Sequence, residues 1–160
     1  MSDVLLRQVS AAEFDTWYAW EVDNYAKEHV AAGNWSEAEA LERSQAEFSM
    51  LLPDGAASPG NHLFTVVDSQ LDEAVGMIWF AERSDNGQPP YAFVYDIVIW
   101  EAQRGRGYGK AAMLDLEEKV REIGLHRIAL HVFGHNERAV RLYEHIGYRP
   151  TNILMSKEIG

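Results

Sequence analysis

The segment best suited to chemistry is a run of glycines and basic residues, Gln103-Arg104-Gly105-Arg106-Gly107-Tyr108-Gly109-Lys110. Glycine permits positive φ angles and lets the backbone approach a ligand closely, because it has no Cβ. If a helix begins directly afterwards, its first amides are unpaired donors at the positive end of the helix dipole. This arrangement suits a phosphate or pyrophosphate. The segment therefore predicts an anion site, against the alternative of a tight turn with solvated basic side chains.

Two familiar phosphate motifs fit this segment poorly. A P-loop needs glycine where Arg104 stands and Ser or Thr where Ala111 stands. A dinucleotide fingerprint can be matched on Gly107, Gly109 and Ala112. That fingerprint normally lies in the first strand–helix turn and is followed by an acid about twenty residues later. Here the segment comes late in the chain and no acid follows at that distance, so dinucleotide binding is a weak alternative.

Hydrophobic periodicity and cap signals indicate the elements that would position this segment. The predicted strands are Val4–Val9, His62–Asp68, Ala74–Arg83, Tyr91–Trp100, Arg127–Phe133 and Ile153–Ile159. The predicted helices begin at Ser10, Ser36, Gly109 and Asn136 and end near Gly33, Leu52, Gly124 and His145. No repeat or long linker divides the chain, so we expect one α/β domain over residues 1–160.

Composition narrows the classes of protein. The chain is 160 residues long, 47% hydrophobic and 24% charged, and it has no cysteine, which excludes disulfides, Cys-ligated zinc and a cysteine nucleophile. The net charge is −11, and all of it falls in residues 1–80, which have 14 acids and 3 bases. Such an acidic chain is a poor candidate for nucleic-acid binding. It has no signal segment and no apolar stretch that could span a membrane, so we expect a cytoplasmic protein with no membrane partner.

The pattern R-x-x-G-x-G on Arg104, Gly107 and Gly109 resembles the acetyl-CoA loop of the GNAT (GCN5-related) N-acetyltransferase superfamily. Downstream, Asn136 and Tyr143 stand seven residues apart, which is similar to the second conserved segment of that family. The element order is also similar over nearly the whole chain, and the likeness is greatest to uncharacterised bacterial members. The resemblance implies an α+β fold, a mixed and mostly antiparallel sheet of about six to seven strands flanked by about four helices.

The resemblance also implies which residues bind acetyl-CoA, the acyl donor. The backbone of one strand would pair with the pantetheine arm, and the amides of the glycine-rich turn would hold the pyrophosphate. No metal is implied. The residues carried over are Ile97, Val98, Ile99, Arg104, Gly105, Arg106, Gly107, Tyr108, Gly109, Lys110 and Asn136. One departure is Glu101, where the family often has proline.

Three residues are candidates for proton transfer. Tyr143 matches the family tyrosine that protonates the CoA thiolate, although its spacing alone would make it a packing residue beside Leu142 and Ile146. Asp96 interrupts an apolar strand, and burial raises the pKa of a carboxyl, so it is a candidate base or a structural acid. His131 stands where some family members carry their base, and a histidine titrates near neutral pH. The alternative for His131 is a packing residue.

The resemblance therefore implies an N-acetyltransferase that moves an acetyl group to a primary amine of a small molecule, peptide or protein. A thioester is already activated, so direct attack in a ternary complex is the simplest mechanism. In this family the acceptor site is built largely by the first two helices and the loop between them, and acids and aromatic residues in this region suit a cationic acceptor. They are Trp17, Trp20, Glu21, Asp23, Tyr25, Glu28 and Trp35. A non-catalytic acyl-CoA sensor is the alternative, and a homodimer, common in the family, is left open.

Overall fold

The computed structural model describes residues 3–160, and its elements follow the predicted order as far as the fourth helix. The strands are β1 (Val4–Gln8), β2 (Asn61–Asp68), β3 (Glu73–Arg83), β4 (Tyr91–Ile99) and β5 (Ile128–Leu130). The α-helices are α1 (Ala11–Ala31), α2 (Glu37–Leu51), α3 (Tyr108–Glu122) and α4 (Glu137–His145), and two 3-10 turns are η1 (Gly55–Ala57) and η2 (Glu101–Gln103). Helix α1 starts where predicted because Ser10 and Glu13 form a reciprocal capping box.

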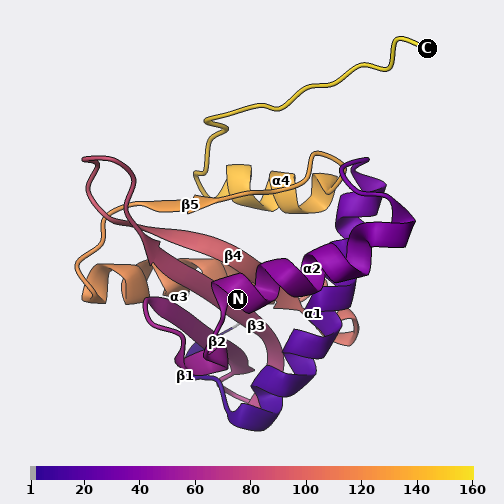
Figure 1. Ribbon diagram of the computed structural model, residues 1–160. Coiled ribbons are helices and arrows are strands. Elements are labelled where there is room, and N and C mark those ends of the chain that lie inside the picture. The colour runs from indigo at the N-terminus through magenta and orange to yellow at the C-terminus, as the bar shows by residue number, and fades with distance from the viewer. Residues whose placement is uncertain (1–2) are drawn as a thin grey trace.

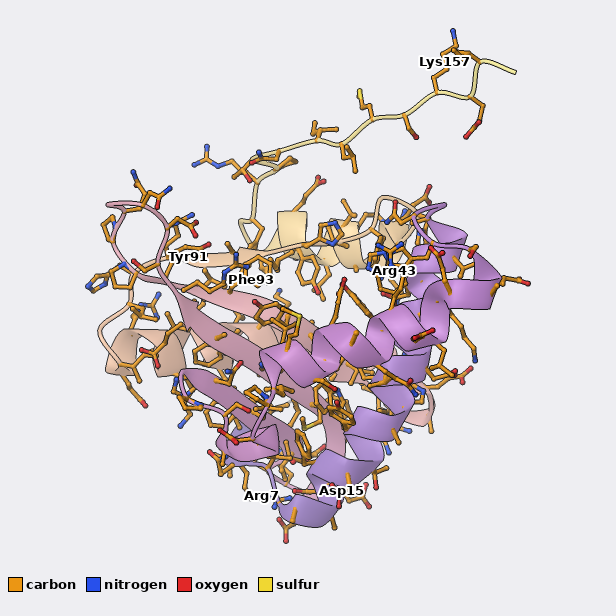
Figure 2. All side chains as sticks on the ribbon, viewed as in Figure 1. Arg7, Asp15, Arg43, Tyr91, Phe93 and Lys157 are labelled. Carbon is orange, nitrogen blue, oxygen red and sulfur yellow. The ribbon has the colours of Figure 1, made fainter. Side chains whose placement is uncertain are left out.

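The strands in residues 3–160 form one sheet in sequence order, with β1 to β4 antiparallel and β5 parallel to β4. The prediction of about six to seven strands is wrong, because the sheet has five. The expected strand at Ile153–Ile159 is not formed: residues 151–160 extend away from the sheet, and Figure 2 shows Lys157 on this segment far from Tyr91 and Phe93. Residue preference can favour an extended backbone, but a strand also needs a neighbour with which to hydrogen-bond. The parallel strand β5 is likewise shorter than the predicted Arg127–Phe133.

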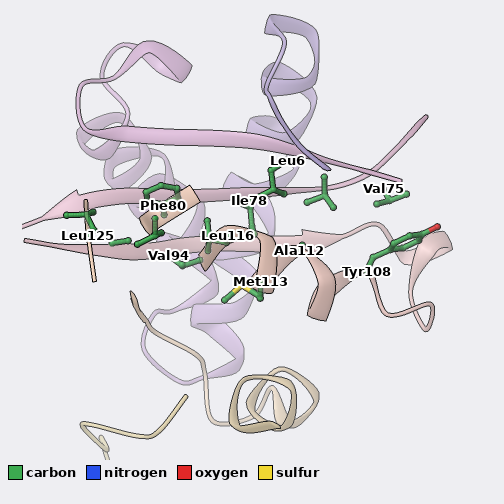
Figure 3. Packing of buried hydrophobic residues seen from close by; sticks show 13 residues of the cluster. Leu6, Val75, Ile78, Phe80, Val94, Tyr108, Ala112, Met113, Leu116 and Leu125 are labelled. Carbon is green, nitrogen blue, oxygen red and sulfur yellow. The ribbon is translucent and has the colours of Figure 1, made fainter. Parts of the chain in front are cut away.

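Helices cover both faces of the sheet (Figure 1). On one face, Trp17 of α1 and Phe48 of α2 pack against Trp79 of β3. On the other face, Met113 and Leu116 belong to a buried stripe of α3 that packs against the sheet (Figure 3). None of the helices described in residues 3–160 has the length and apolarity needed to cross a membrane.

Strand β4 contains one extra residue relative to β3. Val94 pairs with Phe80 and Asp96 pairs with Trp79, so Tyr95 has no partner of its own and forms a β-bulge. The Tyr95 ring stacks on Trp79, with ring centroids 4.6 Å apart. The Asp96 carboxylate turns toward the same face, where it is bonded by α1. The bulge therefore directs two consecutive side chains to one face, which a regular strand does not do.

The pairing between β4 and β5 covers only Ala92–Val94 and Ile128–Leu130. Beyond Val94 the two strands no longer pair, and the described chain supplies no other strand on that side of β4. The edge of β4 after the bulge therefore has no strand partner and is open to a ligand, although Ile99 O already accepts from Arg104 Nε over 3.1 Å.

Candidate active site

A cavity of about 430 Å³ opens along the unpaired part of β4, between the glycine-rich loop, α4 and α1. All of the residues predicted for the site line it except Arg106 and His131. The predicted residues that do so are Asp96, Ile97, Val98, Ile99, Arg104, Gly105, Gly107, Tyr108, Gly109, Lys110, Asn136 and Tyr143. Segments that are far apart in the sequence thus converge on one space. Arg106 lies beside this group and donates to Gln103, which also lines the cavity.

The glycine-rich loop has the geometry of an anion site. Gly105 and Gly107 have φ angles of +81° and +82°, and Gly107 is the N-cap of α3 without a side-chain hydrogen bond. The first amides of α3 therefore lack partners within the helix, and they lie at its positive end. Arg104 and Lys110 line the same end of the cavity. Because a Cβ added at Gly105 would meet nothing within 4 Å, this side of the loop has room for a ligand. The loop fits a pyrophosphate group.

A hydrogen bond to β2 anchors the first residue of α3. Tyr108 Oη donates to Asp68 Oδ2 over 2.5 Å, and Figure 3 shows the Tyr108 hydroxyl at the outer end of the buried cluster. Asp68 Oδ1 accepts from the backbone of Gln70 and Leu71, and the tyrosine is the main reason that the pKa of Asp68 is lowered. Sequence reasoning missed Asp68. Its partner lies 40 residues away, and nothing in the local sequence signals the pairing.

Two carboxyl groups meet at the other end of the cavity, on Glu21 of α1 and Asp96 of β4. Glu21 is only 4% exposed, and its Oε2 has no hydrogen-bond partner. Asp96 Oδ2 accepts from Trp17 Nε1 over 2.8 Å. Burial raises the pKa of both groups, and the charge of Asp96 raises the pKa of Glu21 further. The Glu21–Asp96 pair therefore titrates as a unit that retains a proton where ordinary carboxyl groups have lost theirs.

The acid pair belongs to a polar stripe on α1. Trp17, Glu21, Asn24 and Glu28 follow one another at steps of four, three and four residues, which places them on one helix face. Asn24 Nδ2 donates to Glu28 Oε1 over 3.1 Å, and burial raises the pKa of Glu28. Three of these residues belong to the acceptor region predicted from the sequence, but the pairing of Glu21 with Asp96 was not predicted. The helical spacing of the four residues is the one local signal for this stripe.

Tyr143 approaches the cavity from α4. Its ring packs beside that of Tyr148, with centroids 5.8 Å apart, and against the core under α3. Burial raises the pKa of Tyr143, and the negative charge of Asp96 adds to the effect. The hydroxyl is consequently held in its protonated form, as a proton donor requires. Tyr143 both packs against the core and lines the cavity. The predictions of a packing residue and of a proton donor are therefore compatible.

The other two predicted polar residues have different surroundings. Asn136 lines the cavity, and its side chain also accepts from Ala139 N, so that it caps α4. His131 is exposed and lies outside the cavity, with its ring 5.0 Å from that of Phe133. Phe133 in turn contacts His29 at the end of α1. The structure brings Asp96 and Tyr143 to one cavity and does not bring His131 to it.

Comparisons with known proteins agree with this geometry. The model of the Acetyltransferase (GNAT) family matches residues 14–148. The chain is 38% identical over 154 residues to the uncharacterized N-acetyltransferase YdgE of Bacillus subtilis, covering 96% of this chain and 97% of that protein. It is 35% identical to the uncharacterized N-acetyltransferase YycN of the same organism, covering 98% and 99%. The crystal structure of YycN superimposes with a TM-score of 0.91 over 98% of both chains.

Proposed function

The chain belongs to the GNAT family of acetyltransferases, and from this premise we propose that it moves the acetyl group of acetyl-CoA to a primary amine by direct attack in a ternary complex. The observation that carries the proposal is the single cavity that runs from the basic glycine-rich loop to the Glu21–Asp96 pair, with Tyr143 in its wall. One end of the cavity suits a pyrophosphate, and the other end has groups that can transfer a proton. Acetyl transfer requires the bound acyl donor and the proton-transfer groups to lie in the same space.

The chain's own residues supply the donor site. The first amides of α3, together with Arg104 and Lys110, would hold the pyrophosphate. The unpaired edge of β4 after Val94 would hydrogen-bond the pantetheine arm, as a neighbouring strand would. Acetyl-CoA, when bound, supplies an activated thioester. No nucleophile from the protein is then needed.

Two proton-transfer roles remain for the protein. The Glu21–Asp96 pair accepts the proton of the incoming amine, because its raised pKa makes it a stronger base than an ordinary carboxylate. Tyr143 donates a proton to the departing sulfur, and its raised pKa keeps the hydroxyl protonated until then. We assign the base to this pair in preference to His131, because both carboxyl groups line the cavity and the histidine lies outside it.

The experiment that tests the proposal measures thiol release from acetyl-CoA in the presence of a panel of amines. The chain has no cysteine, so a thiol-reactive dye reports only the CoA produced. Tyr143→Phe should lower kcat about 100-fold while leaving the Kd of acetyl-CoA unchanged. Tyr148→Phe is the matched control, since it removes the same hydroxyl from the adjacent ring outside the cavity, and it should retain activity.

Equal activity in Tyr143→Phe and the unsubstituted chain would remove the acid role. Stabilisation by acetyl-CoA in a thermal-shift titration, without transfer to any amine, would favour a non-catalytic acyl-CoA sensor instead. A specific ligand at about 100 times its Kd stabilises a protein by about 2.7 kcal/mol, which such a titration detects readily.

A further inference from the structure

A second cavity, of about 290 Å³, adjoins the first at the Glu21–Asp96 pair. Both carboxyl groups line both cavities, so the pair lies where the two spaces meet. We call the larger space the donor cavity and the second space the aromatic cavity. The rest of the lining of the aromatic cavity consists of Tyr25, Glu47, Phe48, Met50, Leu51, Trp79 and Tyr95.

We propose that the aromatic cavity binds the acceptor, and that the acceptor is a small primary amine whose body is apolar and about the size of a ring. The proposal rests on the proposed function, because it names the substrate class of that same reaction. It excludes polyamines, amino sugars and protein side chains as preferred acceptors.

The position of the amino group follows from the unpaired carboxylate oxygen. Glu21 is almost fully buried, and its Oε2 has no partner in the described chain. Buried polar atoms of this kind are rare, because each costs free energy unless a partner is supplied. An ammonium group placed beside the pair would donate to this oxygen and be attracted by the charge that the pair carries. The nitrogen would then lie where the two cavities meet, next to the acyl donor.

The body of the acceptor is specified by rings that are held rigidly against one another. Tyr95 stacks on Trp79 at 4.6 Å, and Tyr25 lies edge-on to Phe48 at 5.5 Å. The indole nitrogen of Trp79 is already occupied, because it donates to Asn61 Oδ1 over 2.9 Å. These walls therefore present ring faces and few free hydrogen-bonding groups. A hydroxyl-rich or multiply charged amine would lose hydration here without compensation.

The mouth of the cavity favours a small molecule with one positive charge. Glu47 lies beside Tyr25 there, and its carboxylate adds to burial in raising the pKa of the tyrosine hydroxyl. Met50 is 81% exposed, and its flexible thioether adapts to ligands of different shape. The volume of about 290 Å³ lies just below the usual range for small-ligand pockets, about 300–1,000 Å³, so only a small acceptor fits.

The proposed transfer conserves atoms and protons. The ammonium gives one proton to the Glu21–Asp96 pair, and the free amine forms a C–N bond to the thioester carbon. The C–S bond breaks, the sulfur takes a proton from Tyr143, and the tyrosine regains a proton from the nitrogen. The products are the N-acetyl amine, CoA and one proton, which returns from the acid pair to solvent.

The first test uses the full chain with acetyl-CoA and a matched set of amines. We expect kcat/KM for phenethylamine and isopentylamine to exceed that for ethanolamine, glucosamine and spermidine at least tenfold. Burial of an apolar body stabilises a complex by about 0.8 kcal/mol per methylene group, so a body of several carbons accounts for this ratio. Preference for a polar amine, or for the N-terminus of a short peptide, would overturn the proposal.

The second test changes the mouth of the cavity without touching the core. Met50→Arg should raise the KM for phenethylamine about tenfold by charge repulsion, with the KM for acetyl-CoA unchanged. Arginine is used because it carries no primary amine that could itself be acetylated. Met155→Arg is the matched control: Met155 is 83% exposed on the C-terminal segment and lines neither cavity.

The outcomes separate the two proposals. If acetyl-CoA gives no thermal shift and no amine gives thiol release, the proposed function fails, and this inference fails with it. If acetyl-CoA binds but only polar amines are acetylated, or if Met50→Arg behaves like Met155→Arg, the proposed function stands and the assignment of the aromatic cavity is wrong.

Discussion

The donor cavity and the aromatic cavity share the Glu21–Asp96 pair but present different chemistry to a ligand. In the donor cavity the groups that face a ligand are largely main-chain: the first amides of α3 and the open edge of β4. In the aromatic cavity they are side chains, with rings contributed by α1, α2, β3 and β4. The main-chain groups of the donor cavity come from one stretch, residues 97–110, whereas the rings of the aromatic cavity require four separate elements to be packed together.

This difference separates what a family can share from what it can vary. A site made of backbone depends on φ angles and on the direction of one helix, so it constrains few side chains beyond glycine. A site made of rings can change with each residue that lines it. We therefore expect the acyl donor to be common to relatives of this chain and the acceptor to differ among them.

The largest expected effect comes from substitutions in the Glu21–Asp96 pair. Glu21→Gln and Asp96→Asn keep the shape of each side chain but remove the group that accepts the proton. Each should lower kcat about 10²–10⁴-fold, the usual contribution of general acid–base catalysis. Calorimetry with acetyl-CoA should give an unchanged Kd. If either variant lost acetyl-CoA affinity as strongly as it lost kcat, the pair would be needed for donor binding as well. Donor binding would then depend on side chains as the aromatic cavity does, and the contrast between the two cavities would not hold.

The next effect concerns the pH dependence of stability. The unfolded-state value for Glu21 is 4.5 and burial raises its pKa in the folded chain, so the folded state retains a proton that the unfolded state loses. Folding stability therefore falls as pH rises above 4.5, by at most about 1.4 kcal/mol per pH unit while the difference lasts. Glu21→Gln should flatten this decline in urea unfolding measured from about pH 5 to 8. An unchanged slope would show that the pair is not protonated.

A smaller effect should distinguish the glycine-rich loop from other strained turns. Gly107 has a φ of +82°, and an alanine there adds strain of about 1–2 kcal/mol, which should raise the KM for acetyl-CoA about tenfold. Gly60→Ala is the control, because Gly60 has a φ of +74° and open space around it but lies outside both cavities. Both variants should unfold at lower temperature. Only the first should change kinetics.

The smallest effect concerns the anchor of α3. Tyr108→Phe removes the hydrogen bond to Asp68, which is worth about 1 kcal/mol, and should raise the KM for acetyl-CoA about fivefold with kcat unchanged. Tyr91→Phe removes a similar bond, 2.8 Å to Asp85, at the far end of β4. The control should lose comparable stability with no change in KM. Identical kinetics in the two variants would mean that the anchor does not position the loop.

The sequence predicted the donor cavity better than the acid pair, for a physical reason. The glycine-rich loop is contiguous, so its residue types and spacing are visible along the chain, and Asn136 and Tyr143 form a second short motif. By contrast, the hydrogen bond from Trp17 to Asp96, which holds one member of the acid pair in place, joins residues 79 positions apart. No local sequence pattern indicates this contact.

The prediction of a last strand at residues 153–159 was wrong for a related reason. Residues 153–159 have an apolar composition that favours extended structure, but composition does not reveal whether a neighbouring strand is available. Most of the fold was predictable because helices and hairpins are specified locally. The exceptions are contacts and pairings between distant segments.

The extra residue at Tyr95 changes which side chains of β4 face the core under α3. Before it, Ala92 and Val94 belong to the core under α3; after it, Ile97 and Ile99 do, so the alternation changes from even to odd positions. If the same residues paired with β3 as a regular strand, without the bulge, every side chain after Tyr95 would exchange faces. The carboxyl group of Asp96 would then turn away from Trp17 and Glu21. Removal of Tyr95 itself would instead restore regular pairing and keep Asp96 opposite Trp79, so the bulge adds the Tyr95 ring to this face without displacing the carboxyl group.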